Sequence, residues 1–332
     1  MLSIIIPLYN AELHVANLIK NIKGLDFSNI EVILVNDGSC DSTEALITDF
    51  INSFDSVNLK FINKRNGGVS SARNIGLQNI NPKSLYLTFF DCDDWFYSEV
   101  LNSFLMDIQS LPNPDLVLFN YVRNLGGVSE RIDHKLNGVF SLSENFVMLY
   151  TSGLIQPCWN KVYKTSLIKE NHLCFEEGIS MGEDFRFNIS FLEVSKSVAA
   201  FSSSIYQYNS DSANSLTKRF LPDSFEYFKY GISKVNKLCH LKGIDYPDIH
   251  NRYITALKDR CRNLALSTLS YKEKNILFYE DFSFVRNNLD KIKTGSLSPQ
   301  DRIIYMFVRL NLPKFIWLAF SLHRLIKFES YK

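Results

Sequence analysis

The first ~120 residues alternate short apolar runs with helical patterns, and this alternation constrains the fold more than any other feature. Five runs rich in Ile, Val, Leu and Phe lie at 2–6, 31–35, 58–62, 85–90 and 115–119. Continuous apolar runs of this length are typical of strands buried on both faces. The stretches 11–24, 42–54, 70–79 and 98–108 carry apolar residues at helical spacing. The order predicts an α/β domain with a doubly wound sheet, whose ligands bind beyond the C-terminal ends of the strands.

The rest of the chain has a different character. Residues 126–221 show short, less regular patterns, and after Pro222 long helical patterns follow at 223–242, 248–268 and 271–290. We therefore expect one domain over 1–221, divided near residue 125, and a helical region over 222–332.

Composition excludes several classes of protein. The chain has 332 residues, 46% hydrophobic and 21% charged, which indicates a folded protein rather than a disordered one. Its formal charge of +1 gives no global field for nucleic acid, so we expect no nucleic-acid partner. The six cysteines lack CxxC spacing and are interpreted as reduced thiols. Met1–Pro7 has no basic leader and no apolar run reaches about 18 residues, so we expect a cytoplasmic protein.

The most informative segment is Leu87–Trp95, where an apolar run leads directly into Asp91, Asp93 and Asp94. Side chains two apart in an extended chain point the same way, so Asp91 and Asp93 share a side. Two converging carboxylates repel each other unless a cation lies between them, and oxygen ligands favour Mg²⁺ or Mn²⁺. The segment is either a metal site that bridges to a diphosphate or a solvated acidic turn.

Three further segments allow a functional and a structural interpretation. Asp37 follows an apolar run, where it would hold a nucleoside or cap the next helix. Gly67 and Gly68 precede a helix, so their N–H groups with Arg73 would bind an anion or only form a turn. Glu183 and Asp184 open a helical pattern and would act as a base or complement the helix dipole. Dinucleotide and P-loop fingerprints are absent, which argues against a dehydrogenase or a P-loop kinase.

Taken in order, these segments resemble family 2 glycosyltransferases with the GT-A fold. Ile4–Asn10 resembles the first strand and nucleotide-contacting turn, and Trp159-Asn160-Lys161 resembles a WNK segment of bacterial polysaccharide members. The likeness is specific over 1–125, looser over 155–220, and lapses beyond 222. It implies a Rossmann-like α/β fold with a doubly wound, mostly parallel sheet and a helical C-terminal extension.

The resemblance also implies roles for individual residues. Asp91 and Asp93 would bind Mn²⁺ or Mg²⁺, and Asp184 would be the catalytic base, with Glu183 as its rival. Lys218 and Arg219 match a loop that closes over the diphosphate, although paired basic residues are also simply solvated. The nucleotide-sugar site implied by the resemblance comprises Pro7, Tyr9, Asn10, Asp37, Asn66, Gly67, Gly68, Arg73, Asp91, Cys92, Asp93, Trp159, Lys161, Lys218 and Arg219.

The implied activity is inverting, metal-dependent transfer of a hexose or N-acetylhexosamine from a UDP-sugar. The implied acceptor is a saccharide on polyprenyl diphosphate, as in bacterial O-antigen or capsule assembly. Residues 299–328 mix aromatic and basic side chains, which suits either a helix at the inner membrane surface or one docked on the protein's own core. The alternatives are a non-catalytic nucleotide-binding assembly protein and a nucleotidyltransferase, which normally has a Gly-rich basic loop where this chain has residues 7–12.

Overall fold

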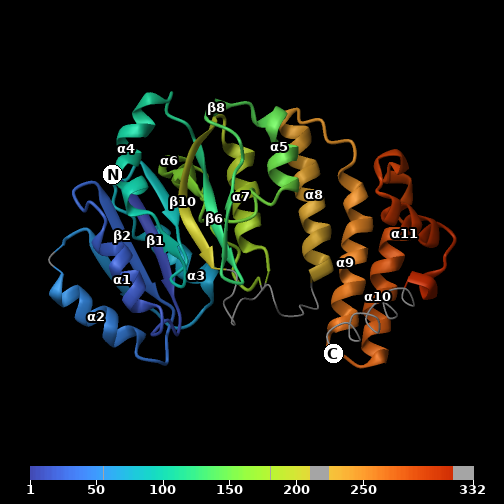
Figure 1. Ribbon diagram of the computed structural model, residues 1–332, viewed down its shortest axis with the longest axis horizontal. Coiled ribbons are helices and arrows are strands. Elements are labelled where there is room, and N and C mark those ends of the chain that lie inside the picture. The colour runs from blue at the N-terminus through green and yellow to red at the C-terminus, as the bar shows by residue number, and fades with distance from the viewer. Residues whose placement is uncertain (55, 180, 210–223, 317–332) are drawn as a thin grey trace. The chain divides into compact units, whose positions relative to one another are not determined.

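The computed structural model describes residues 1–54, 56–179, 181–209 and 224–316 (Figure 1). The chain divides into two compact units, residues 1–215 and 216–332, called unit 1 and unit 2 below. Each unit is described by itself. Unit 1 holds the mixed sheet with its helices, and unit 2 is helical.

The sheet of unit 1 begins with four parallel strands in the order β3-β2-β1-β4. It continues through β9, β6, β10 and β5, where β9 runs antiparallel to β4 and β6, and β6 runs parallel to β10. The expected α/β fold with a largely parallel sheet is thus confirmed. The strands are β1 (Leu2–Leu8), β2 (Ile30–Asn36), β3 (Leu59–Asn63), β4 (Tyr86–Phe89), β5 (Trp95–Phe96), β6 (Leu116–Leu125), β9 (Lys161–Lys164) and β10 (Val198–Asn209).

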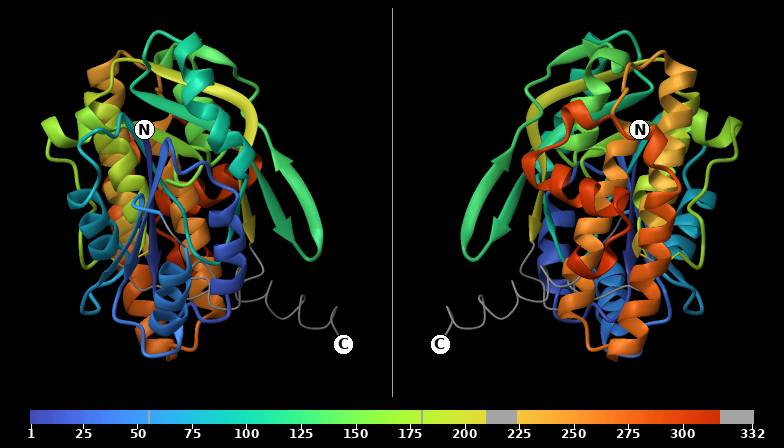
Figure 2. Two further views of the ribbon diagram at one scale, coloured as in Figure 1. Left: turned by 90° about the vertical axis from the view of Figure 1, so that its left-hand side faces the viewer. Right: turned by 90° about the vertical axis from the view of Figure 1, so that its right-hand side faces the viewer.

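Two strands lie off the main path of the sheet. β7 (Val128–Ile132) pairs only with β6, in an antiparallel hairpin closed by Gly126 and Gly127, and β8 (Gly138–Phe140) pairs with β10. Figure 2 shows this green hairpin extending away from the rest of unit 1.

Helices cover both faces of the sheet, as a fully buried central strand requires. Ile4 and Ile6 of β1 join one apolar cluster with residues of α1 (Val15–Lys23), α2 (Thr43–Ser53) and α4 (Ser98–Asp107). Ile5 points to the other face and meets α3 (Val69–Gln78), where a Cβ on Gly76 would lie 2.4 Å from Ile5 Cγ2. Gly76 therefore lets α3 approach the strand.

An aromatic cluster holds the helix that carries the second acidic pair, α7 (Glu183–Val194). The Phe187 ring stacks on Phe175 with centroids 4.3 Å apart and meets Phe89 of β4 edge-on. Tyr163 of β9 packs against Phe187 and Phe191. The two remaining helices of unit 1 are α5 (Leu142–Thr151) and α6 (Thr165–Glu170).

The described part of unit 2 has four α-helices, α8 (Ser224–Lys242), α9 (Arg252–Leu266), α10 (Tyr271–Arg286) and α11 (Pro299–Arg309), and short 3₁₀ turns between them. α9 contacts the other three. Its buried Arg260 pairs with Asp281 at 2.8 Å and donates to Ser224 at 3.1 Å, which links α8, α9 and α10. The helical C-terminal region is confirmed. No helix among the described residues is long and apolar enough to cross a bilayer.

Candidate active site

The acidic segments meet at one edge of the sheet. β1, β2 and β4 are neighbouring parallel strands, so their C-terminal ends lie at the same edge. Asp37 follows β2 and Asp91 follows β4 there.

Asp37 closes the turn that leads into α3. Its Oδ1 accepts from Lys64 Nζ at 2.5 Å and from the Gly67 N–H at 2.9 Å, and its Oδ2 accepts from the Gly68 N–H at 2.7 Å. Gly68 adopts a φ of 87°, which favours glycine. The two glycine N–H groups thus serve Asp37 and are not free for a diphosphate here, while a contact between Asp37 and a nucleoside stays a prediction.

The turn after β1 is tied to the turn after β2. Asn10 Oδ1 accepts from the Cys40 N–H at 2.8 Å, and the Asn10 N–H donates to Ser39 Oγ at 3.0 Å. Tyr9 beside it is 52% exposed, whereas Pro7 lies buried within β1. Of these three residues, Tyr9 offers a free ring to a ligand and Asn10 fixes the turn that carries it. Asn66 is exposed at the start of the glycine turn.

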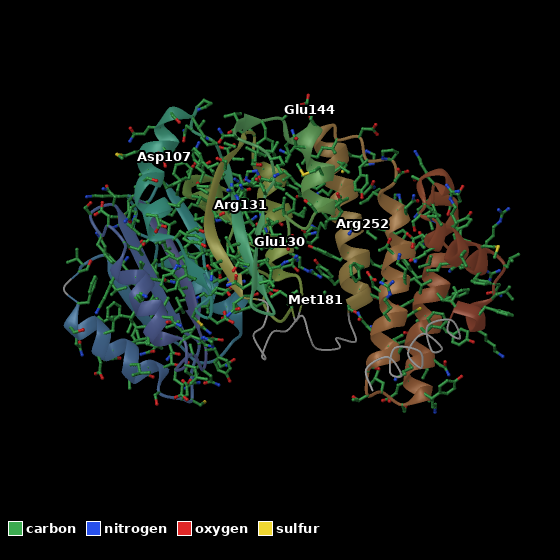
Figure 3. All side chains as sticks on the ribbon, in the orientation of Figure 1. Asp107, Glu130, Arg131, Glu144, Met181 and Arg252 are labelled. Carbon is green, nitrogen blue, oxygen red and sulfur yellow. The ribbon has the colours of Figure 1, made fainter. Side chains whose placement is uncertain are left out.

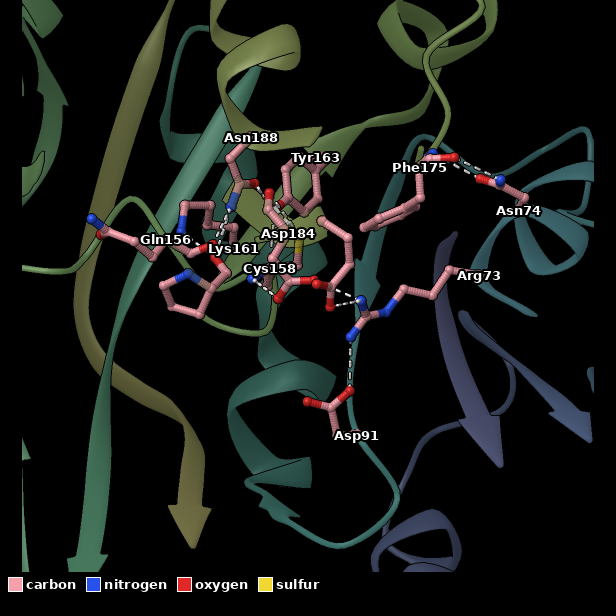
Figure 4. Close-up of polar contacts among 12 residues, drawn as sticks. Arg73, Asn74, Asp91, Gln156, Cys158, Lys161, Tyr163, Phe175, Asp184 and Asn188 are labelled. Atoms are coloured by element: carbon pink, nitrogen blue, oxygen red, sulfur yellow. Dashed lines mark hydrogen bonds and ion pairs between the residues drawn. The ribbon is translucent and has the colours of Figure 1, made fainter. Parts of the chain in front are cut away.

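Arg73 joins the two acidic segments (Figure 4). From α3 its buried guanidinium donates to Asp91 Oδ1 at 2.9 Å, to Asp184 Oδ1 at 2.6 Å and to Glu183 Oε1 at 3.4 Å. It also lies 5.2 Å from the centre of the Phe175 ring. One cation thus faces three carboxylates. Burial raises the pKa of Asp91 to about 6, although the Arg73 charge opposes this shift.

Asp184 is fixed by two elements. In addition to Arg73, its Oδ2 accepts from the Cys158 N–H at 3.1 Å. Asn188, one turn further along α7, donates to the carbonyls of Ile155, Gln156 and Pro157 and so holds the same loop. Glu183 forms an ion pair with Arg73, and burial raises the pKa of its carboxyl group. The geometry holds Asp184 more firmly, and the choice of base stays a prediction.

The residues after β4 fit a divalent cation. Both oxygens of Asp93 and Oδ2 of Asp91 accept no hydrogen bond from the described residues, and both side chains are partly exposed. No group of three or more His, Cys, Asp and Glu among the described residues is placed to hold a metal by itself. Mg²⁺ and Mn²⁺ are commonly held by one or two carboxylates plus phosphate and water oxygens, so the pair suffices for an ion that arrives with a diphosphate.

Asp94 belongs to the support of this segment. Its Oδ2 accepts from Tyr206 Oη at 2.8 Å and its Oδ1 from the Asn209 N–H at 2.7 Å, and burial raises its pKa to about 7. Tyr206 Oη in turn accepts from the Asp91 N–H at 3.1 Å. Cys92 packs against the core, and burial raises the pKa of its thiol.

The WNK segment faces inward rather than toward a ligand. Trp159 is 8% exposed and stacks on Tyr206 and Tyr208, with ring centroids at 4.7 and 5.5 Å. Lys161 is fully buried, and its Nζ donates to Leu154 O at 2.8 Å, Pro157 O at 2.5 Å and Asn160 Oδ1 at 2.7 Å. The structure therefore does not present Lys161 to a nucleotide sugar, because all three donors of its ammonium bind its own loop. Lys218 and Arg219 lie outside the described residues.

Three supporting residues carried no role in the sequence analysis. Asn74 accepts from the Phe175 N–H at 2.8 Å and donates to the Phe175 carbonyl at 2.9 Å, which pins the loop before α7. Asn188 holds the loop of residues 155–157, and Tyr206 holds the segment of residues 91–94 after β4, called the metal segment below, as described above. The only sequence signal is position, since Asn74 follows Arg73 directly and Asn188 lies four residues after Asp184.

Comparison with known proteins agrees with this geometry. The profile of glycosyl transferase family 2 matches residues 3–171, about half of the chain. The chain is 27% identical over 223 residues to EpsJ of Bacillus subtilis, named an uncharacterized glycosyltransferase, covering 66% of this chain and 63% of EpsJ. It is 36% identical over 146 residues to the minor teichoic acid biosynthesis protein GgaA of the same organism, covering 42% of this chain and 31% of GgaA. The chain thus spans less than two thirds of either relative.

A solved structure shows the same fold. The crystal structure of Staphylococcus aureus TarS residues 1–349 in complex with UDP-GlcNAc superposes with a TM-score of 0.73 at 18% identity, over 98% of this chain and 92% of that one. At this identity the likeness establishes the GT-A architecture alone. From the family match, supported by the acidic edge of the sheet, the chain belongs to glycosyl transferase family 2.

Proposed function

We propose that this protein is an inverting, metal-dependent glycosyltransferase that moves a hexose or N-acetylhexosamine from a UDP-sugar to a hydroxyl of a saccharide. One observation carries the proposal. Arg73 brings Asp184 of α7 and Asp91 of the metal segment to one guanidinium, so that a candidate base and a candidate diphosphate site lie side by side. UDP-GlcNAc in the TarS structure, which has the same fold, supports the choice of UDP.

The donor is proposed to lie across the ends of β1, β2 and β4. The exposed Tyr9 ring stacks on the base, and Asp37 Oδ2, which accepts one hydrogen bond within the protein, accepts a second from a base N–H. Asp93 and Asp91 Oδ2 would hold the Mg²⁺ or Mn²⁺. A divalent ion there supplies positive charge against the leaving diphosphate.

The acceptor is proposed to meet Asp184. Its carboxylate takes the proton from an acceptor hydroxyl while the hydroxyl oxygen bonds to the anomeric carbon. The bond from that carbon to UDP breaks on the opposite face, so a single displacement inverts the centre and releases UDP. Arg73 and the Cys158 N–H fix the carboxylate for this transfer. Glu183 is the rival base.

The turn after β1 argues against a nucleotidyltransferase. Asn10 and Glu12 tie this turn to residues 39–42, and it contains neither glycine nor a basic side chain to hold a triphosphate.

We propose that the acceptor belongs to bacterial surface polysaccharide assembly, such as O-antigen, capsule or teichoic acid, and is carried on polyprenyl diphosphate at the inner face of the membrane. The teichoic acid relative supports this class of acceptor.

Two substitutions test the assignment of base and metal. Asp184→Asn is expected to bind UDP with Mn²⁺ in calorimetry like the parent protein, yet to lose transfer by roughly 10²–10⁴-fold. Asp93→Ala is expected to lose the Mn²⁺-dependent part of UDP binding. The transfer assay uses a panel of UDP-sugars chosen by thermal shift, since the true donor stabilises most.

The matched control is Asp107→Asn, which makes the same change at an exposed position at the end of α4 (Figure 3). It should leave binding and transfer unaltered. Full turnover by Asp184→Asn removes it as the base and, if Glu183→Gln is inactive, assigns that role to Glu183. No transfer by the parent protein, together with intact polysaccharide assembly in cells that carry Asp93→Ala or Asp184→Ala, supports a non-catalytic protein.

A further inference from the structure

α11 has two apolar sides, of which one is buried among the described residues of unit 2. Asp301, Ile304 and Val308 are buried, and the helix contacts α9 and α10. The described part of the 299–328 segment is therefore docked on the protein's own core. Ile303, Met306 and Leu310 lie three and four residues apart on the opposite side and are exposed. Exposed Phe315 follows and stacks on Phe307 at 5.8 Å. Leu310 and Phe315 lie just beyond the C-terminal end of α11, and together with Ile303 and Met306 they are called the outer face of α11.

Basic side chains flank this outer face. Arg302, Arg309 and Lys314 are exposed. Arg302 also donates from Nε to the Leu297 carbonyl at 3.1 Å and from Nη2 to the Gly295 carbonyl at 3.0 Å, which leaves its Nη1 for a ligand. The single acidic residue of α11, Asp301, points inward and pairs with Lys258 at 2.6 Å. The outer face thus combines apolar side chains with cations and has no acidic residue in the described segment 302–316.

The net charge of unit 2 also favours an anionic partner. Residues 216–332 carry 21 Lys and Arg against 11 Asp and Glu, a formal charge of +10, whereas residues 1–215 carry −9. The chain's total of +1 conceals this separation. A cationic unit is attracted to anionic surfaces over about a Debye length.

We propose that the outer face of α11 docks unit 2 on an anionic lipid surface. Ile303, Met306, Leu310 and Phe315 enter the boundary between headgroups and acyl chains, while Arg302, Arg309 and Lys314 bind lipid phosphates. This arrangement gives an interfacial helix that lies in the membrane plane. It concerns the membrane and not the donor, so it holds whether or not the proposed transfer reaction is correct.

A lipid surface fits this face better than other partners do. Nucleic acid would engage the cations but leave the apolar side chains in water. A second copy of this chain, related by a two-fold axis, would bring together two faces that both carry Arg302, Arg309 and Lys314 and no acidic side chain among the described residues 302–316, so the two positive faces would repel each other. Anionic headgroups above an apolar layer match both properties of the face.

Vesicle co-sedimentation of the full chain tests the proposal. The protein should bind vesicles of equimolar phosphatidylcholine and phosphatidylglycerol, and bind phosphatidylcholine vesicles far less. Leu310→Glu removes an apolar contact and adds a repelled charge, so it should lower the partition coefficient at least about tenfold. Lys314→Gln should lower it about fivefold, because one basic residue near an anionic surface is worth about 1 kcal/mol.

Matched variants separate this face from the rest of unit 2. Leu241→Glu makes the same change in α8 at a leucine that is also 58% exposed, and Lys272→Gln removes an exposed lysine of α10. Both should bind vesicles like the parent protein.

The proposal is overturned if the parent protein does not bind the anionic vesicles. It is also overturned if Leu241→Glu and Leu310→Glu lower vesicle binding equally. If Leu310→Glu instead dissociates an oligomer in light scattering, or lowers thermal stability without changing vesicle binding, the face belongs to a second copy or to the chain's own residues. The assay contains no donor or acceptor, so its failure leaves the transferase proposal standing.

Discussion

Arg73 binds carboxylates from two segments that are about 90 residues apart in the chain. Its planar fork reaches Asp91 through one terminal nitrogen and Asp184 through the other, which a single ammonium cannot reproduce. We therefore regard it as a positioning residue for both acids. Sequence reasoning placed it at the nucleotide because a cation beside a glycine turn usually faces a phosphate. In the structure its two terminal nitrogens are occupied by carboxylates.

Arg73→Lys should therefore fold, but Asp91 and Asp184 should no longer be held in their present positions. We expect the free energy of unfolding to fall by about 2 kcal/mol, because charge-assisted hydrogen bonds to buried carboxylates are lost, and kcat to fall more than UDP affinity. Urea unfolding and steady-state transfer measure the two effects. Arg123→Lys, at the exposed pair with Glu130, is the control and should change stability by less than about 0.5 kcal/mol. An equal effect of both substitutions would contradict the positioning role.

Lys161 should give a pH-dependent contribution to stability. Burial lowers its pKa to about 7, well below the ordinary value, while three oxygens within hydrogen-bond distance favour its charged form. Between pH 7 and about 10 the unfolded chain then binds more protons than the folded one, so stability rises with pH, by up to about 1.4 kcal/mol per unit.

Lys161→Met should lack this rise and, at pH 7, be less stable by about 2 kcal/mol because buried oxygens lose their donor. Urea unfolding of both proteins at pH 7, 8 and 9 tests the sign. The gap between parent and variant should widen with pH. A constant gap would mean that Lys161 titrates as a surface lysine does.

The residues chosen from sequence were those whose chemistry shows in a local pattern. Asp91, Asp93 and Asp184 stand at ends of regular elements, where spacing fixes the direction of the side chain, and the structure brings two of them to one guanidinium. Lys161 stands at the start of a four-residue strand, and no periodicity indicates that its side chain turns inward. Partnerships across the fold, such as Asn188 with the carbonyls of 155–157, depend on tertiary packing.

At the scale of elements, the contact of α3 with β1 sets the position of Arg73. A Cβ on Gly76 would lie 2.4 Å from Cγ2 of buried Ile5, a β-branched side chain that cannot rotate away freely. Gly76→Ala should therefore destabilise the protein by about 1–3 kcal/mol, although alanine favours a helix over glycine by nearly 1 kcal/mol. Thermal unfolding measures the change.

Gly295→Ala is the matched control for that substitution. No atom lies within 4 Å of a Cβ at this position, and its φ is not left-handed, so its stability should stay within about 0.5 kcal/mol of the parent. Increased stability of Gly76→Ala would mean that helix propensity outweighs the close approach to Ile5.

Most strands of the first ~120 residues were predictable, including the start of β6 at 115–119, whereas β5 and the strands after residue 125 were not. The runs at 2–6 and 31–35 correspond to β1 and β2, because strands buried on both faces need continuous apolar sequence. The run at 58–62 corresponds to β3, which is only partly buried. β10 contains Ser202, Ser203 and Ser204, and its register with β6 shifts at that point. A bulge tolerates such an interruption, but the sequence then shows no continuous apolar run.

At the scale of the whole molecule, the charge separation predicts different responses of the two binding reactions to salt. The proposed donor complex, UDP with one divalent ion, is anionic and is assigned to unit 1, which carries −9, whereas the vesicle surface is assigned to unit 2, which carries +10. Raising salt shortens the Debye length from about 10 Å at 0.1 M to about 3 Å at 1 M and weakens both long-range interactions. Vesicle binding should then be largely lost, while UDP affinity at saturating Mn²⁺ should stay within about twofold or increase. Over one salt series, co-sedimentation measures vesicle binding and calorimetry measures UDP affinity, so the two responses can be compared directly. Parallel losses would mean that cations dominate the field at the nucleotide and would contradict the expectation that the acidic charge of unit 1 governs its salt response.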